Sequence, residues 1–274
     1  MESLAEVVRR IVASRWKSVL FGAISISVFL LAWHGFSTYL DDNEVGYAKY
    51  IPYPMDVAEA FFDSFVTPDP GTELLMGDHV LASLNRVFLG FCLALLIALP
   101  AGLLMGSMKP AEQLGMPIVE IFRPIPPLAW IPIMLVVFGF LWGPVMIVFL
   151  GIFFPILLNV MFGVASIDQP LIDAARTLGA KRRHIFLKVM LPFTLPYLIT
   201  GIKVGLGIGW MCIVAAEMIG NYGGGVGYYI WSSLATGRIA YMFAGMVVIA
   251  LLGMLTTGIA GQAEKRLYKW MGMK

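Results

Sequence analysis

The residues of greatest chemical interest are charged side chains that lie inside or beside long apolar stretches. Lys203 and Glu217 fall within one apolar stretch, and Arg123 stands at the start of another that is rich in proline. Inside a membrane, ionisable groups usually face a bundle interior or a water-filled cavity. Charged groups in such positions are therefore the first residues whose surroundings need an explanation.

The sequence contains none of the motifs that would let the chain catalyse a reaction. The phosphate-binding pattern G-x-x-x-x-G-K-[ST] is absent, and the glycine-rich run 223–227 is not followed by Lys-Ser or Lys-Thr. The three histidines, His34, His79 and His184, are scattered, H-E-x-x-H is absent, and both cysteines sit in apolar runs. We therefore expect no catalytic residues, no metal site and no nucleotide bound by this chain.

Composition indicates a membrane protein. Hydrophobic residues make up 59% of the 274 residues and charged residues 13%, whereas an ordinary soluble domain is about 45–50% apolar and about 25% charged. This excess is too large for one buried core, and it argues against a disordered chain, a nucleic-acid-binding tail protein and a disulfide-rich secreted module. The sequence predicts an all-α, multi-pass membrane protein with no nucleic-acid partner.

Six apolar segments are expected to cross the bilayer, which takes about 20 residues each. The charge-free stretch from Ile125 to Ala165 is about twice the length of one span, so we divide it at the turn-forming sequence Gly139–Pro144. The predicted spans are 18–40, 87–108, 117–138, 145–163, 192–219 and 239–261.

Basic residues of the short connections predict the orientation of the chain. They gather in segment 1–17, between the fourth and fifth spans, and in the C-terminal tail, whereas the connection between the first two spans carries nine acidic residues and one lysine. With six spans, the basic segments fall on one side. Both termini are therefore predicted to be cytoplasmic, and residues 18–274 to form one transmembrane domain.

The connection 41–80 is too long for a tight turn. It contains four prolines and an amphipathic run from Met55 to Val66, which predicts an extracytoplasmic loop with one short helix. Its acidic character has two interpretations: a solvated cap, or a docking surface for an external partner.

The cytoplasmic segment 166–191 predicts two short helices joined by a glycine elbow. Pro170 suits a first helical turn, and Gly179 ends that helix. A second helix is expected to begin near Lys181, and Pro192 marks re-entry into the membrane. Spacing alone allows a basic hairpin on anionic lipid or a docking site for a protein. The apolar face of the first helix is formed by Leu171, Ala174, Ala175 and Leu178.

This hairpin resembles the "EAA" coupling loop of ABC importer permeases, which has the pattern E-A-A, three residues, G, nine residues, I, a spacer and L-P. The sequence departs from that pattern twice. An aspartate replaces the glutamate, with a shorter reach, and the isoleucine lies nearer the glycine, with Val189 as the alternative. The matching residues are Asp173, Ala174, Ala175, Gly179, Ile185, Leu191 and Pro192.

A second stretch, Arg123–Pro132, resembles a signature of permeases for nitrate, bicarbonate, taurine and alkanesulfonates. The runs Val214–Met218 and Gly223–Tyr228 fit the same subfamily, and the resemblance covers the chain from about Ile51 onward. It implies the type I ABC importer permease fold and import of a small anion or organic sulfonate by alternating access. It also implies a second permease copy, an extracytoplasmic substrate-binding protein, and two ABC ATPase subunits that bind ATP and Mg²⁺.

Within this framework, prolines break the predicted third span, which is expected to line the pore rather than to pack as a kinked helix. Broken backbone at membrane depth is tolerated only where protein or a water-filled cavity covers it. Arg123 either favours anions at the inner mouth or pairs with Glu120 on the same helix face. The candidates for the translocation path are Arg123, Pro126, Trp130, Asn159, Trp210 and Glu217.

The remaining candidates each have a second interpretation. Glu217 either shapes an outer cavity or belongs to a buried structural pair, and Lys203 is expected to extend its amine toward the cytoplasmic interface. Trp210 either lines the cavity or packs. Asn159 either faces the lumen or makes an interhelical hydrogen bond.

The alternative to an ATP-driven importer is a self-sufficient secondary transporter or channel. Many secondary transporters have inverted repeats and paired broken helices. This sequence has one strongly broken span and no evident internal repeat, and the cytoplasmic hairpin has no obvious purpose in that class of protein.

Overall fold

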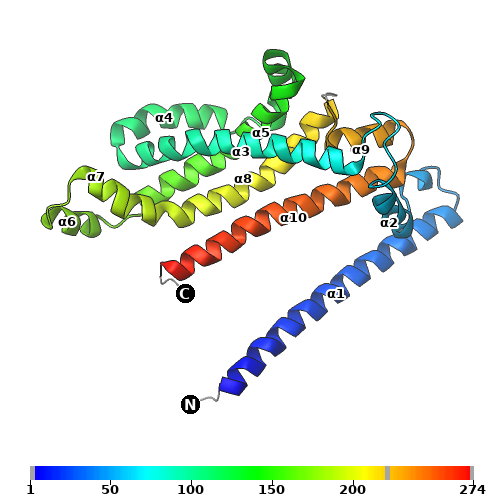
Figure 1. Cartoon of the computed structure of the whole chain (residues 1–274), viewed down its shortest axis with the longest axis horizontal. Coiled ribbons are helices and arrows are strands. Elements are labelled where there is room, and N and C mark those ends of the chain that lie inside the picture. Colours follow the sequence, from blue (N-terminus) through cyan, green and yellow to red (C-terminus); the bar gives the residue numbers. More distant parts are fainter. Residues whose placement is uncertain (1–3, 220–222, 272–274) are drawn as a thin grey trace.

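The computed structural model describes residues 4–219 and 223–271, and these residues form helices and no strands. Long helices run along the molecule and shorter ones gather at its two ends (Figure 1). In chain order, the elements are α1 (Leu4–Asp42), η1 (Ala48–Tyr50), α2 (Pro54–Asp63), α3 (Met76–Ser107), α4 (Lys109–Phe122), η2 (Pro127–Trp130), α5 (Ile131–Ala165), α6 (Gln169–Thr177), α7 (Arg182–Ile185), η3 (Phe186–Met190), α8 (Leu191–Ile219), α9 (Val226–Ala235) and α10 (Ile239–Trp270).

The second part of α5 forms the centre of the core, where it packs against both α3 and α8. Bulky residues four positions apart project from it and are fully buried: Val148, Ile152, Ile156 and Val160. The facing helices carry glycines where these side chains approach. A Cβ at Gly205 of α8 would lie 3.0 Å from Ile152 Cγ2, and a Cβ at Gly90 of α3 would lie 2.7 Å from Val148 Cγ1. Small residues thus let the helices pack closely, as is common in membrane bundles.

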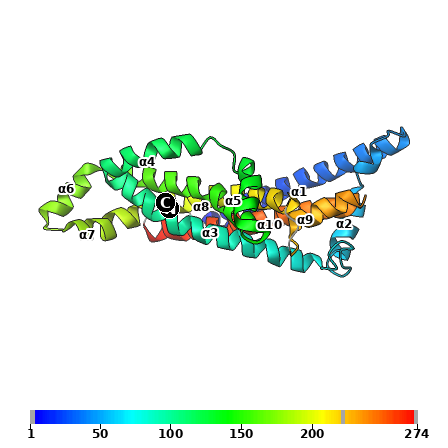
Figure 2. The same ribbon diagram turned by 90° about the horizontal axis from the view of Figure 1, so that it is seen from above.

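The predicted third span is not one continuous helix. Its residues are divided among the end of α4, the short 3₁₀ turn η2 and the start of α5, and an extended connection joins α4 to η2 (Figure 2). Gly139 then interrupts α5 with a non-helical backbone (φ 68°, ψ 178°). The break that the sequence predicts in this span is therefore present, because the prolines of 124–132 remove backbone donors and prevent helical continuity, although 117–138 is not a single helical element.

Five helical segments of the described chain are long and apolar enough to cross a membrane: Val19–Asp42, Met76–Ser107, Pro127–Ala165, Arg183–Ile219 and Ile239–Lys269. The all-α membrane fold is confirmed, with the difference that the expected third and fourth spans meet in a single interrupted element. The chain nevertheless runs back and forth between the two ends of the bundle in the predicted order. The segments α4, η2 and the start of α5 lead from one end of the bundle toward the other, and the rest of α5 returns (Figure 1).

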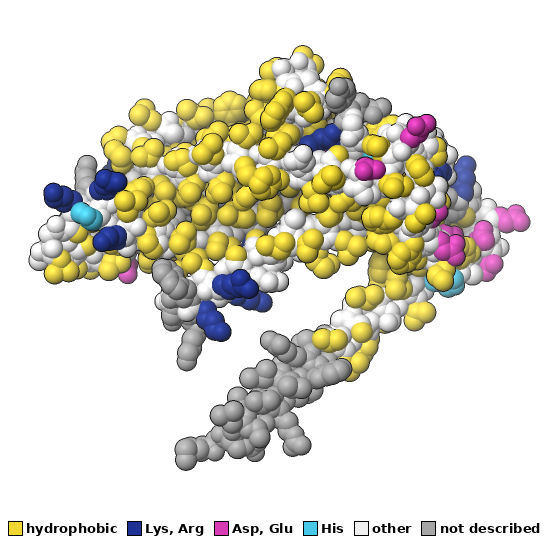
Figure 3. All heavy atoms as spheres, viewed as in Figure 1, with side chains coloured by type: hydrophobic (Ala, Val, Ile, Leu, Met, Phe, Trp, Pro, Cys, Tyr) yellow, Lys and Arg dark blue, Asp and Glu magenta, His cyan; other side chains and the backbone are white. Residues whose placement is uncertain are grey.

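The two ends of the bundle differ in charge. Acidic side chains gather over α2 and the neighbouring connections, and basic ones gather over α6, α7 and the end of α10 (Figure 3). The start of α1 and the end of α10 point toward the basic end (Figure 1). This arrangement agrees with the predicted orientation. α1 diverges from the bundle and approaches it near its own end, where the rings of Trp33 and Phe243 are 5.7 Å apart between centroids.

Candidate functional site

The coupling hairpin forms as the sequence predicts. α6 carries Asp173, Ala174 and Ala175, and Gly179 follows it in a left-handed backbone conformation (φ 79°) that favours glycine. The second arm differs from the prediction, since α7, the π-helical turn η3 and α8 form one continuous helical segment. Leu191 and Pro192 therefore lie inside this continuous segment, directly after the π-helical turn, and Pro192 does not mark the start of a separate helix.

The hairpin has one apolar side packed and another exposed. Ile185 is buried with Ile167 and Ile172 in a small core that ties the two arms together. On the outer side, Leu178 is 88% exposed and Leu171 is 47% exposed. Exposed leucines beside a rigid glycine turn are a suitable contact surface for another protein.

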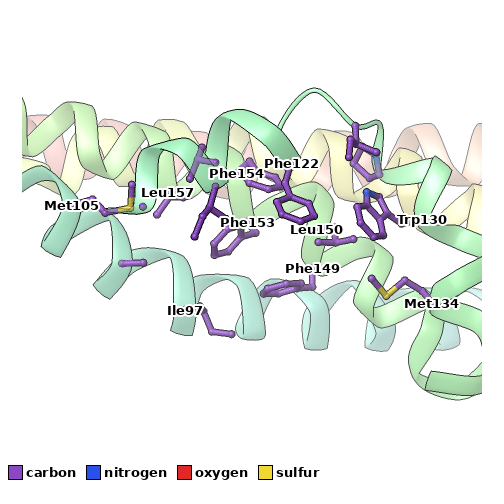
Figure 4. Close-up of a pocket in the computed structure, with 16 residues that line it drawn as sticks. Ile97, Met105, Phe122, Trp130, Met134, Phe149, Leu150, Phe153, Phe154 and Leu157 are labelled. Carbon is purple, nitrogen blue, oxygen red and sulfur yellow. The ribbon is translucent and has the colours of Figure 1, made fainter. Parts of the chain in front are cut away.

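Trp130 lines an apolar cavity of about 500 Å³ between α3, α4 and α5. The close-up shows Trp130 with aromatic residues of α4 and α5 around it (Figure 4). Pro126, immediately before η2, is exposed and lies outside the lining of this cavity. The lining has no charged residue, so this cavity offers an anion no compensating charge.

Arg123 is exposed at the end of α4. Within the described chain it forms no ion pair with Glu120, although the two residues are three positions apart. The pairing interpretation is therefore wrong. An exposed guanidinium remains available at that position, and its role toward anions stays a prediction.

Three other candidate side chains make polar contacts within the protein. Trp210 is 3% exposed in the main core, and its indole Nε1–H donates to Thr256 Oγ1 at 2.9 Å. Asn159 donates within its own helix, to the Pro155 carbonyl oxygen at 2.8 Å. Lys203 pairs with Glu264 of α10 at 2.7 Å. The side chain of Lys203 is 38% exposed in this pair, so its extension toward the cytoplasmic interface stays a prediction.

Glu217 is fully buried in an ion pair with Arg86 of α3. Arg86 Nη1 donates to Glu217 Oε1 at 2.7 Å and to the Gly224 carbonyl oxygen at 2.8 Å. Ser83 Oγ lies 2.8 Å from Glu217 Oε2, and the Gly227 N–H donates to the same oxygen at 3.0 Å. Of the two interpretations, the structure supports the buried pair. A carboxylate with these donors is compensated on several sides.

His79 extends this polar cluster toward α2. His79 Nδ1 lies 3.0 Å from the Gly225 nitrogen and 3.1 Å from the Gly225 carbonyl oxygen, and Nε2 lies 3.3 Å from Thr72 Oγ1. Tyr229 packs on the imidazole at 5.3 Å between ring centroids, and burial raises the pKa of Tyr229 to about 12. The cluster thus fastens the glycine-rich connection to the first turns of α3.

Sequence reasoning missed Arg86, Ser83 and His79 because the predicted second span began at Val87. The structure starts α3 at Met76, which places these three side chains at positions i, i+4 and i+7 of one helix face. That spacing was the signal that could have found them. A polar stripe of this kind beside an apolar run indicates a longer helix whose outer end is buried by protein.

Comparison of structures identifies the class of protein. The inward-facing MetNI methionine ABC transporter contains a chain that aligns with a TM-score of 0.60 at 24% identity, over 69% of this chain and 94% of that chain. A similarity at this level of identity shows the fold, which is that of an ABC importer permease.

Sequence comparison then identifies the family. The model of the binding-protein-dependent transport system inner membrane component matches residues 91–269. An ABC transporter permease of Methanocaldococcus jannaschii is 42% identical over 72% of this chain and 74% of its own. The taurine transport system permease of Escherichia coli is 33% identical over 81% of each chain, and the nitrate import permease of Leptolyngbya laminosa is 33% identical over 78% of each.

The chain belongs to the family of binding-protein-dependent transport system inner membrane components. It is therefore a non-catalytic, multi-pass permease subunit of an ABC importer in the inner membrane, and its complex includes ATPase and substrate-binding partners.

Proposed function

We propose that this permease imports a small anion or an organic sulfonate, of the nitrate, bicarbonate, taurine or alkanesulfonate class. The support is the identity of 33% to permeases named for taurine transport and for nitrate import, each over more than three quarters of the chain. The proposed solute enters from the acidic end of the bundle, where a substrate-binding protein delivers it.

The proposed working assembly contains two permease copies and two ATPase subunits. ATP and Mg²⁺ bind to the ATPase subunits, because this sequence has no phosphate-binding loop of its own. Closure of the ATPase pair moves the two coupling hairpins, and the packed helices convert that movement into opening toward the outside. Such alternating access requires an element with two arrangements that the ATPase can bias.

The observation that carries the coupling proposal is the exposed apolar edge of the hairpin. Leu178 is 88% exposed directly before the left-handed Gly179, while the core behind it is buried and fixes the two arms. An apolar side chain held outward on a rigid support fits a cleft in a partner.

A pull-down of the tagged permease from gently solubilised membranes tests this assembly. We expect an ATPase subunit at near-equal amount with the native chain and a strong loss of it with Leu178→Asp. Ala58→Asp is the matched control, because it adds the same charge at an exposed position of α2 at the opposite end. Retention of the ATPase by Leu178→Asp would contradict the proposed contact. Isolation of the native chain alone in several mild detergents would contradict the proposed assembly.

A further inference from the structure

A second cavity, of about 400 Å³, lies near the outer end of the bundle and differs in chemistry from the aromatic one. It is bounded by α3, by the part of α5 that follows the Gly139 interruption, and by the glycine-rich connection. Its lining residues are Ala82, Asn85, Arg86, Leu89, Leu141, Trp142, Val145 and Gly223.

Among the described residues that line this cavity, the one charged residue is Arg86, which is also the ion-pair partner of Glu217. Arg86 lines the cavity, whereas Glu217 is fully buried and is not part of the lining. Apart from Arg86, the lining residues that the structure describes are one amide, apolar side chains and glycine, with no Asp or Glu among them. An arginine beside an amide, with no acidic residue among the described lining residues, can attract a small anion more readily than a cation.

The arginine of the cavity is held in place. Arg86 Nη1 is fixed by Glu217 at 2.7 Å and by the Gly224 carbonyl at 2.8 Å, so its position does not depend on a ligand. Asn85 is the next residue on α3, and its side-chain amide can donate hydrogen bonds to an oxyanion. Gly223 adopts φ 70°, and a Cβ at this position would have no other atom within 4 Å, which leaves open space on that side.

We propose that this cavity is an outer subsite for the transported anion, in which Arg86 supplies positive charge and Asn85 donates hydrogen bonds to the anion's oxygens. The inference rests on the proposed function, because the anion is the solute of that importer. Nitrate and the sulfonate group of taurine share the chemistry that the cavity recognises. Leu141 and Trp142 form the apolar wall against which the rest of a sulfonate would lie.

Asn85→Asp tests the subsite without removing a partner of Glu217. In proteoliposomes that hold the complete importer with its binding protein and ATP, we expect the KM for nitrate or taurine uptake to rise about tenfold or more, since a carboxylate then faces the anion. Asn43→Asp is the matched control: it adds the same charge at an exposed position at the acidic end, and we expect a change of no more than about twofold. Equal melting temperatures of the native complex and the two variants would exclude misfolding as the cause of a change in KM.

A labelling experiment gives a readout that does not depend on uptake. In a chain with Cys92→Ala and Cys212→Ala, the Asn85→Cys thiol is treated with a sulfonate-bearing or a quaternary-ammonium methanethiosulfonate reagent. Relative to Asn43→Cys, we expect the anionic reagent to be favoured at position 85, and nitrate or taurine to slow its reaction.

The outcomes separate the subsite from the proposed function. Unchanged KM in Asn85→Asp, together with the same reagent preference at positions 85 and 43, overturns the subsite. If the native complex hydrolyses ATP but imports neither nitrate nor taurine, the proposed substrates are wrong. In that case a preference for the anionic reagent at position 85 still supports an anion subsite, and its absence overturns the subsite as well.

Discussion

Removing the carboxylate of Glu217 should be among the most destabilising single changes in this chain. Glu217 is 0% exposed, and its carboxylate lies 2.7 Å from the guanidinium of Arg86. Glu217→Gln keeps the shape of the side chain but removes this anionic partner of Arg86. Breaking a buried ion pair from one side costs about 3–5 kcal/mol. Arg86→Gln should cost a similar amount, because it leaves the Glu217 carboxylate buried without its cation.

The double variant distinguishes a lost charge partner from a lost contact. With both charges gone, neither is left uncompensated, so Arg86→Gln with Glu217→Gln should destabilise by less than the sum of the single changes, with a coupling of about 1–3 kcal/mol. The assay is equilibrium unfolding of the purified permease by titration with sodium dodecyl sulfate in mixed micelles, followed by circular dichroism.

The chain offers a matched control for this experiment. Lys203 and Glu264 are also 2.7 Å apart, but their side chains are 38% and 17% exposed. Glu264→Gln should therefore cost only about 1 kcal/mol or less, because solvent compensates the lysine that remains. Equal losses in Glu217→Gln and Glu264→Gln, or strictly additive effects in the double variant, would refute the reasoning from burial.

Three further predictions follow from local geometry. Gly179→Trp should leave the permease in the membrane and abolish uptake measured at equal permease content, because the turn holds φ 79°; normal uptake would refute the coupling role. Gly90→Val should destabilise by about 1–3 kcal/mol in the same unfolding assay, because a Cβ there would lie 2.7 Å from Val148 Cγ1, and Gly207→Val, where nothing lies within 4 Å, should not. A hydrogen bond from Tyr241, helped by one from Thr67, holds the pKa of Asp63 below its usual value. The ionised Asp63 carboxylate should therefore stabilise the folded protein fully above about pH 4, the pKa of this group in the unfolded chain. That contribution to folding stability should be lost as pH falls through the lower pKa of the folded state. Melting temperatures measured from pH 7 down to about pH 3 should therefore drop less in Asp63→Asn.

Sequence reasoning predicted the parts of the fold that depend on local composition. Apolar length identified the membrane helices, and the uneven distribution of lysine and arginine gave an orientation that agrees with the charged ends of the bundle (Figure 3). The coupling hairpin was also predicted, because Pro170 and Gly179 act on their own backbone: one suits a first helical turn and the other permits a left-handed residue.

The sequence also contains a pattern that indicates the close packing of α5 against α8, although it was not used in the prediction. Gly201, Gly205 and Gly209 recur every four residues on α8, a pattern typical of close helix contacts in membranes. Hydropathy treats these glycines only as weakly apolar residues. Their partners lie on α5, and the sequence alone does not specify which helix fills the space that they leave.

The polar cluster could not be assembled from the sequence because its members are far apart. Arg86 and Glu217 are separated by 131 positions, and neither has a charged partner at helical spacing on its own helix that would suggest the pair. The charge of Arg86 marked the end of a span in the prediction, since a lone arginine inside a bilayer is costly. In the fold, α9 and the glycine-rich connection cover the outer turns of α3, so the arginine is compensated by protein instead of by water.

The position of Arg86 explains why its two roles need different variants. The same residue pairs with Glu217 and is one of the residues that line the outer cavity. Any substitution of Arg86 therefore changes stability and anion affinity together and cannot assign either effect. Glu217→Gln changes the buried side and leaves the cavity lining in place, whereas Asn85→Asp changes the cavity and leaves the buried pair in place. A fall in stability confined to the first variant and a rise in KM confined to the second would show that one arginine serves both the fold and the solute.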